Sequence, residues 1–303
     1  MKYLASGKRL LLLVAAAVMS GPCVTWALDL AKSLDLAKSL DLAKSPDSAK
    51  SPDPTPDHIE LVDQLQTPGI ESELSGIAPH LTDDGLYYVV TNKRPGYREG
   101  QTPKLAPNLR GKLLTVNRKG TVVDAMPLTE QDYGGIAYGG GYLYVAVQEP
   151  AEILQVDLKS RKVLAHFAMS GPAGGLEYDR DRDLLYAMLY VGYPHLAVID
   201  PKTHETVGTL WSDEGEMGLA KVGGELLCTW TSGWDPGSFS ELRVLNTADG
   251  QVIRRLPLKG VHSSLSPLDA KVSGINGFMS LVTTNSVTGA TIIQRYRYSH
   301  AAP

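Results

Sequence analysis

The stretch Asp132-Tyr-Gly-Gly-Ile-Ala-Tyr138, followed by Leu143-Tyr-Val-Ala-Val147, decides the fold of this chain. A pair of glycines opens an apolar run, a Gly-rich turn follows, and the second run alternates Leu, Tyr and Val. Aliphatic and aromatic residues in short runs favour β-strands, and the glycines between the runs mark a tight turn. The stretch therefore predicts two consecutive antiparallel strands.

The same pattern recurs along the chain. Further copies start at Ser75-Gly-Ile-Ala78, Gly174-Gly-Leu-Glu177 and Met217-Gly-Leu-Ala220. Each copy continues into a second apolar strand, a third strand that ends in Asn or Asp, and a fourth strand after a polar turn. The later copies are about 40–46 residues apart, which is the period of a four-stranded propeller blade. The repeats therefore predict an all-β fold, the β-propeller.

The last copy lacks a fourth strand. It contains Ser266-Pro-Leu-Asp269, Phe278-Met-Ser-Leu-Val282 and Ala290 to Tyr298. We expect Ile59-Glu-Leu-Val-Asp63, which resembles the fourth strands of the other copies, to fill the gap, because closing the ring removes an open sheet edge. The expected fold is a five-bladed propeller over residues 58–303. A sixth blade is the alternative, and it would have to lie in the insertion Arg94 to Arg110.

The N-terminal region is expected to lie outside the propeller. Basic residues precede the apolar run Leu10 to Met19, and Thr25 and Ala27 then provide the small residues of a cleavage site. Residues 1–27 are therefore typical of a secretory signal peptide. The hexapeptide Leu-Asp-Leu-Ala-Lys-Ser then repeats and leads into a Pro-rich end, which favours a flexible linker over residues 28–57. We expect a periplasmic or secreted protein with no integral membrane segment after cleavage.

Composition and charge restrict the partners. The chain has 303 residues with 29 basic and 33 acidic side chains, a net charge of −4. This balance gives no electrostatic case for nucleic-acid binding. After cleavage Cys228 would be the remaining cysteine, and we interpret it as a buried small hydrophobe rather than a reactive thiol. A closed ring exposes few sheet edges, so a monomer is expected.

The motifs Glu73-Leu-Ser-Gly-Ile-Ala78 and Asp132 to Tyr138, each with its following strand, resemble the exported propellers grouped as SdiA-regulated or phytase-like esterase proteins. More loosely, they resemble the gluconolactonase-type propellers of the NHL kind. In those families a Glu often precedes the Gly-Ile pair and reaches a metal in the channel. The corresponding positions here are Ser75, Gly134, Gly174, Met217 and Ser266. The resemblance therefore implies the fold, and it does not carry over the metal chemistry.

Two kinds of propeller loop share one face around the channel mouth: those from strand four to the next strand one, and those from strand two to strand three. Aromatic rings beside polar side chains on these loops suit a sugar or an aromatic ligand. The basic 94–110 insertion suits a lid that attracts an anionic or zwitterionic ligand. The candidate ligand-binding residues are Glu73, Lys93, Arg94, Asp132, Tyr133, Glu149, Tyr190, Tyr193, His195, Trp230, Trp234 and Asp235.

Catalysis is a second hypothesis for the same face. His262 with Glu214 or Glu216, or alternatively His195 with Glu149, would form a general base that a carboxylate orients. No Gly-x-Ser-x-Gly motif supplies a nucleophilic serine. The segment Asp179-Arg-Asp-Arg-Asp183 resembles a calcium loop but lacks its Gly and its distal Glu, so we interpret it as a turn. The cofactor stays unknown, with Ca²⁺ or another divalent metal as the candidate.

The sequence leaves three functions open. Binding of a small polar or aromatic ligand at the channel mouth, without turnover, is preferred. A hydrolase or lactonase of the phytase-like esterase kind is second. A protein-interaction platform is third.

Overall fold

The computed structural model describes the strands of the repeat region and many of their turns. Contacts divide the chain into two units, Met1–Asp53 and Pro54–Pro303. The expected signal peptide, the expected linker and the 94–110 insertion lie outside the described residues. Those residues are 58–71, 74–79, 86–91, 111–128, 133–191, 195–211, 216–222, 225–231, 240–257, 265–275, 278–285 and 290–299.

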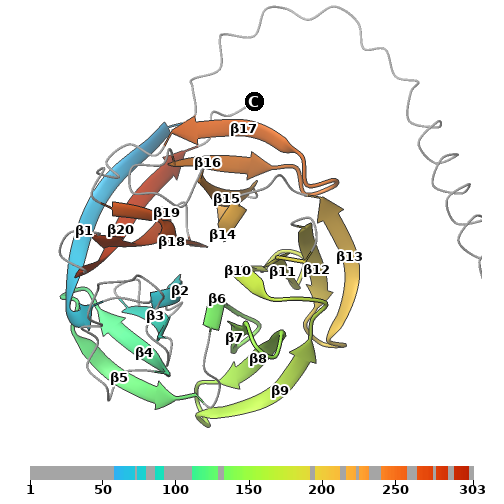
Figure 1. The fold of residues 1–303 in the computed structure, drawn as a ribbon, viewed down its shortest axis with the longest axis horizontal. Coiled ribbons are helices and arrows are strands. Elements are labelled where there is room, and N and C mark those ends of the chain that lie inside the picture. Colours follow the sequence, from blue (N-terminus) through green and yellow to red (C-terminus); the bar gives the residue numbers. More distant parts are fainter. Residues whose placement is uncertain are drawn as a thin grey trace, which may run out of the picture. The chain divides into compact units, whose positions relative to one another are not determined.

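The described strands form five antiparallel sheets of four strands each (Figure 1). Sheet 1 contains β2 (Leu74–Pro79), β3 (Leu86–Thr91), β4 (Lys112–Asn117) and β5 (Val122–Pro127). Sheet 2 contains β6 (Tyr133–Gly139), β7 (Tyr142–Val147), β8 (Glu152–Asp157) and β9 (Lys162–Ala168). Sheet 3 contains β10 (Ala173–Asp179), β11 (Leu184–Leu189), β12 (His195–Asp200) and β13 (Glu205–Trp211). Sheet 4 contains β14 (Glu216–Val222), β15 (Glu225–Thr231), β16 (Ser240–Leu245) and β17 (Val252–Pro257). Sheet 5 contains β1 (His58–Glu71), β18 (Leu265–Ile275), β19 (Phe278–Asn285) and β20 (Ala290–Ser299).

Sheet 5 joins the first described strand to the last. Its order is β1-β20-β19-β18, and β1 runs antiparallel to β20. Ile59 is paired with Tyr298, and Asp63 is paired with Arg295, whose guanidinium donates to the Asp63 carboxylate at 2.7 Å. The expected all-β propeller is therefore confirmed, as is the pairing of its first and last segments. No sixth sheet occurs among the described strands.

The innermost strands close into a ring (Figure 1). They contact one another in the order β2, β6, β10, β14, β18, and β18 contacts β2. Neighbouring inner strands run in the same direction: Gly134 near the start of β6 backs onto Ala173 at the start of β10, and Gly139 at the end of β6 backs onto Tyr178. We call the end where the inner strands begin the mouth end, and the opposite end the far end.

The outermost strands share one irregularity. In four sheets the outermost strand carries a one-residue bulge near the far end, where the register with its neighbour shifts. Bulges twist an edge strand away from a partner, so they protect the unpaired outer edges from strand addition. The bulged residues are exposed aliphatics, namely Val123, Leu164, Val207 and Ile253.

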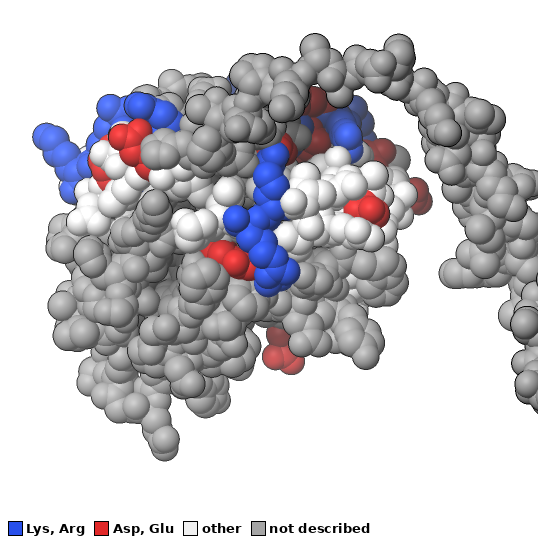
Figure 2. All heavy atoms as spheres, turned by 90° about the horizontal axis from the view of Figure 1, so that it is seen from above, with Lys and Arg blue, Asp and Glu red and all other residues white. Residues whose placement is uncertain are grey.

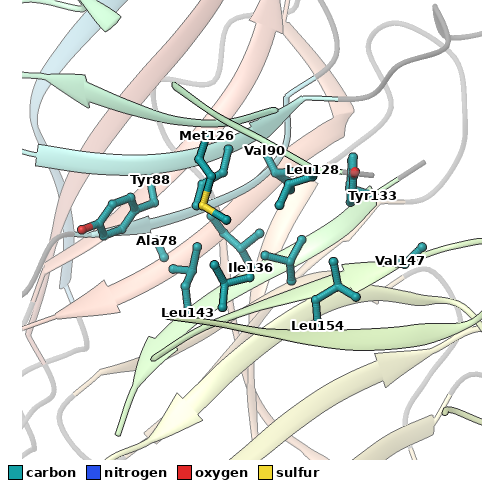
Figure 3. Packing of buried hydrophobic residues seen from close by; sticks show 13 residues of the cluster. Ala78, Tyr88, Val90, Met126, Leu128, Tyr133, Ile136, Leu143, Val147 and Leu154 are labelled. Carbon is teal, nitrogen blue, oxygen red and sulfur yellow. The ribbon is translucent and has the colours of Figure 1, made fainter. Parts of the chain in front are cut away.

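The core lies between the sheets as a series of apolar clusters. Figure 3 shows the cluster between sheets 1 and 2, in which Met126 and Val90 of sheet 1 meet Ile136 and Leu154 of sheet 2. The sequences of these strands are nearly continuous apolar runs because the strands are covered on both sides. Cys228 is fully buried in the cluster between sheets 3 and 4, which confirms its interpretation as a small hydrophobe.

The described surface carries charges of both signs. On the side of the ring shown in Figure 2, basic and acidic side chains lie close together rather than in separate fields. Ion pairs such as Arg161–Asp124, at 2.6 Å, agree with this mixing. None of the described residues belongs to a helix that is long and apolar enough to cross a membrane.

Candidate functional site

The mouth end gathers the two loop types in which the candidate residues lie. Each sheet is an antiparallel meander, so the start of its inner strand and the end of its second strand meet at this end. Tyr133, Glu149, Tyr190 and His195 are described there with their side chains, and Glu216 and Trp230 by their strand positions. Outside the described residues lie Glu73, Lys93, Arg94, Asp132, Tyr193, Glu214, Trp234, Asp235 and His262.

The glycine pairs of the repeats produce a bulge at the start of the inner strands. In sheet 2 the register shifts between Tyr133 and Ile136, and in sheet 3 between Ala173 and Gly175. Corresponding shifts occur in the inner strands of the other three sheets. A bulge re-aims the local backbone, and the repeat therefore places an irregular backbone segment at the mouth end of every sheet.

In sheet 3, Tyr190 follows β11 and packs against this irregular segment of β10. A Cβ added to Gly174 would overlap the Tyr190 ring, coming within 2.5 Å of its hydroxyl oxygen and 2.8 Å of Cζ. The backbone N–H of Tyr190 donates to the carbonyl oxygen of Pro172 at 2.9 Å. The residue is nevertheless 36% exposed. Gly174 thus lets the ring rest against the backbone, while the residue as a whole stays partly exposed.

Gln148 holds the same segment from the side of sheet 2. It follows β7 directly, and its Nε2 donates to the carbonyl oxygen of Ala173 at 2.8 Å. This bond joins the end of a second strand in one sheet to the start of the inner strand in the next. Gly134 makes room for it, because a Cβ there would lie 2.6 Å from Gln148 Nε2. The backbone segment on which the Tyr190 ring rests is therefore held by hydrogen bonds from both sheet 2 and sheet 3.

The remaining described candidates differ in environment. Tyr133 is only 3% exposed and belongs to the cluster between sheets 1 and 2, so its described role is packing. Glu149 is exposed beside Gln148 and precedes Pro150. His195 is partly buried at the start of β12, opposite Leu189, the residue before Tyr190. The mouth end of sheets 2 and 3 thus combines an aromatic ring, an amide, a carboxylate and an imidazole.

Sheet 4 brings charged groups to its own mouth end. The strand register aligns Glu216 with Trp230, and Trp230 with Glu241. Glu241 is buried, and its Oε1 accepts hydrogen bonds from Arg243 Nε at 2.8 Å and Arg255 Nη1 at 3.0 Å. A buried carboxylate needs such partners, because desolvation would otherwise disfavour its charge. Glu241 and Arg243 were not among the residues predicted from the sequence.

Glu177 is another buried carboxylate that the sequence prediction missed. It is 3% exposed in the inner strand β10, paired in register with Tyr186. The corresponding positions in sheets 1, 2 and 4, each paired with the same position of its second strand, are Ala78, Ala137 and Ala220. A charged residue where three other copies have alanine was a visible signal, because it breaks the repeat at an interior position.

Tyrosines join neighbouring sheets towards the far end. The rings of Tyr144 and Tyr178 stack with centroids 5.7 Å apart, and those of Tyr88 and Tyr138 at 6.0 Å. Burial raises the pKa of Tyr144 to about 12 and that of Tyr88 to about 12, because the phenolate would be poorly solvated there. These phenols are neutral structural groups at physiological pH.

No metal centre is formed by the described side chains. In this part of the chain no group of three or more His, Cys, Asp and Glu residues is placed to hold an ion. The arrangement at the mouth end suits stacking and hydrogen bonding to a ligand, and the described groups do not assemble a nucleophile with an oriented base. The catalytic candidates His262 and Glu214 stay predictions.

Comparison with known proteins supports the fold and adds no family. A scan of protein families finds no match to this chain, and a search of curated proteins finds none either. The glutaminyl cyclase of Myxococcus xanthus superposes with a TM-score of 0.56 at 13% identity, over 82% of this chain and 100% of that chain. Hydrazine synthase of Kuenenia stuttgartiensis gives a TM-score of 0.44 at 14% identity, over 71% of this chain and 57% of that one. A chain of the mitotic checkpoint complex gives 0.43 at 17% identity, over 83% and 73%. At 13% identity, the likeness to the glutaminyl cyclase establishes the propeller-like fold alone.

Proposed function

We propose that the propeller binds a small polar or aromatic ligand at the mouth end, with the exposed side of the Tyr190 ring as the contact surface. The observation that carries the proposal is the position of the Tyr190 ring on Gly174 in a residue that stays 36% exposed. A ring that is already fixed loses little conformational entropy on binding, and aromatic faces stack on sugars and on other rings.

The neighbouring groups agree with a ligand that has both a flat face and polar edges. Gln148 and Glu149 follow β7 at the mouth end of the neighbouring sheet 2, and His195 begins β12, the strand after Tyr190 in sheet 3. Binding sites of this kind combine an apolar wall with a few placed polar groups. We infer a neutral sugar or an aromatic amino acid as the ligand class.

The test uses full-length protein and a panel of monosaccharides, disaccharides and free aromatic amino acids. Thermal shift identifies a binder, and calorimetry then compares variants. Tyr190→Ala should weaken binding by about two- to twelvefold, since an aromatic contact contributes about 0.5–1.5 kcal/mol. Tyr190→Phe, which keeps the ring, should stay within a few-fold of wild type. Tyr142→Ala, at the far end of sheet 2, is the matched control and should leave affinity unchanged.

Two alternative functions, a protein-interaction platform and an enzyme, predict different experimental results. Val191, next to Tyr190, is 41% exposed and favours a protein-interaction platform. That platform would show no response to the small-molecule panel and would lose its partner in Val191→Asp. A hydrolase or lactonase of the phytase-like esterase kind predicts turnover that is lost in His262→Ala and Glu214→Gln with folding intact. Unchanged panel binding in Tyr190→Ala would contradict the preferred proposal.

Export belongs to the proposal as well. We infer a periplasmic or secreted monomer that binds a small molecule, with residues 1–27 removed and residues 28–57 acting as a linker. The support is the charge and hydropathy pattern of the N-terminal sequence. N-terminal sequencing of protein recovered from the periplasm or medium tests it, with a first residue of Leu28 expected.

A further inference from the structure

Gln148 is the counterpart of Tyr190 in the neighbouring sheet. Gln148 directly follows β7 in sheet 2, and Tyr190 directly follows β11 in sheet 3. β7 and β11 are the second strands of their sheets, so both residues lie at the mouth end. The same position of the repeat therefore provides an amide in one sheet and an aromatic ring in the next.

The two side chains contact consecutive residues of β10. Gln148 Nε2 donates to the carbonyl oxygen of Ala173 at 2.8 Å, and the Tyr190 ring packs on Gly174, the next residue. Ala173 is only 1% exposed, so this part of the backbone is anchored in the protein interior. An amide group and an aromatic ring are thus positioned by two adjacent backbone residues.

The bond to Ala173 determines the orientation of the Gln148 amide. A carbonyl oxygen accepts hydrogen bonds and cannot donate them, so the amide must turn its nitrogen toward Ala173. Oε1 then lies on the other arm of the amide, and the described residues provide no donor to it. Gln148 is partly buried, and its Oε1 is not one of the buried atoms that lack a partner in the described part of the chain, so solvent reaches this acceptor.

The surrounding backbone keeps the amide in this orientation. Gly134 leaves the space in which the bond forms, since a Cβ there would overlap the Ala173 carbonyl oxygen and lie 2.6 Å from Gln148 Nε2. Turning the amide over would place two carbonyl oxygens against each other and lose the hydrogen bond. A polar group whose direction is fixed before binding distinguishes donors from acceptors on a ligand.

We propose that Gln148 determines the specificity of the Tyr190 site by accepting, through Oε1, a hydrogen bond from a hydroxyl or N–H group at the edge of a ligand ring stacked on Tyr190. This inference rests on the proposed ligand-binding function and narrows its ligand class to rings that carry such a donor. A ring that presents only acceptors at that edge would face the carbonyl oxygen of the amide and bind less tightly.

The test uses full-length protein and pairs of probes that differ in one hydrogen-bond donor. The pairs are L-tryptophan with 1-methyl-L-tryptophan, and D-glucose with each of its mono-O-methyl ethers. Calorimetry is carried out with the pair that wild type binds best. Wild type should bind the donor-bearing member about two- to twelvefold more tightly, the usual range for one neutral hydrogen bond.

Three variants separate the acceptor from the bond to Ala173. Gln148→Met keeps the length of the side chain and removes the acceptor, so it should bind both members of the pair equally. Gln148→Glu keeps an acceptor but places a carboxylate oxygen against the Ala173 carbonyl oxygen, so it should melt at a lower temperature and still prefer the donor. Gln155→Met, which removes an amide that donates to the Tyr144 hydroxyl at 3.5 Å, is the matched control in sheet 2 and should keep the wild-type preference.

The ligand-binding function and the role of Gln148 fail in different ways. If no probe binds, or if Tyr190→Ala leaves binding unchanged, the ligand-binding function is contradicted and the role of Gln148 with it. Binding that depends on Tyr190 but shows no preference for the donor, or a preference that Gln148→Met retains, overturns the role of Gln148 alone. If Gln148→Met does not fold, the preferences of wild type and Gln148→Glu within the pair still decide the question.

Discussion

The Tyr190 ring rests on the backbone of Gly174, where any larger residue would overlap it. Gly174 is the first glycine of the repeat motif in sheet 3, and in sheet 2 the first glycine, Gly134, makes the same kind of room for Gln148. The motif thus does more than start a strand. In both sheets it admits the side chain that follows the second strand, and so positions that side chain at the mouth end.

Gly174→Ala should therefore displace the Tyr190 ring and destabilise the domain by roughly 1–3 kcal/mol, the usual cost of inserting a methyl group into a filled space. Urea unfolding measures the change. Gly208→Ala is the control, because a Cβ there would meet Val198 at an ordinary 3.6 Å. Equal stability of both variants and wild type would mean that the ring moves aside freely.

Leu154 and Leu164 provide a matched pair in sheet 2. Leu154 is fully buried between sheets 1 and 2, whereas Leu164 is the exposed bulged residue of β9. Leu154→Ala should cost about 2–5 kcal/mol through lost burial and the cavity left behind. Leu164→Ala should stay within about 0.5 kcal/mol. Chemical denaturation checks both, and a large loss at Leu164 would reveal a contact that its exposure does not predict.

Buried tyrosines should make the domain sensitive to alkali. Burial raises the folded-state pKa of Tyr144 from 10.0 to about 12, so its neutral form stabilises the fold fully below pH 10. That contribution is lost as the pH rises from about 10 towards 12. Tyr144→Phe cannot ionise and should shift alkaline unfolding to higher pH, followed by circular dichroism and phenolate absorbance. Tyr142→Phe, at a partly exposed tyrosine of the same strand, is the comparison, and identical midpoints would argue against the mechanism.

The pairing of β1 with β20 should be essential for a monomeric ring. Deleting residues 58–66 removes most of the register with β20 and leaves that strand with an unpaired edge. Such edges template aggregation, so size-exclusion chromatography should show oligomers or loss of soluble protein. A synthetic peptide of residues 58–71, added during refolding, should restore the monomer peak. A soluble monomer without the peptide would show that closure is dispensable.

The fold was predictable because the same strand pattern recurs several times in the sequence. Gly134-Gly135 and Gly174-Gly175 mark the inner strands, and the likeness of Ile59–Asp63 to the other fourth strands predicted its pairing with the C-terminal strand, which the structure confirms. Repetition makes the prediction robust, because each copy must bury the same faces against its neighbours.

The site was predictable only in part. Loop order placed Tyr190 at the mouth end, but it did not distinguish Tyr190 from Tyr133, since the direction of each ring depends on packing between sheets. The buried charges escaped prediction for a different reason. Glu177 and Glu241 lie within strands whose apolar neighbours predict core. Burial of the Glu241 carboxylate depends on hydrogen bonds from Arg243 of its own strand and Arg255 of the next strand, which the apolar pattern does not reveal.

Because the fifth sheet needs both His58 and Ser299, the order of synthesis sets the order of completion. A ribosome delivers the outer strand of that sheet first and its partner last, so four sheets can be finished while the opening strand still waits. The ring consequently stays unclosed throughout synthesis. Any factor that binds the chain before its release from the ribosome therefore binds an open form rather than the finished ring.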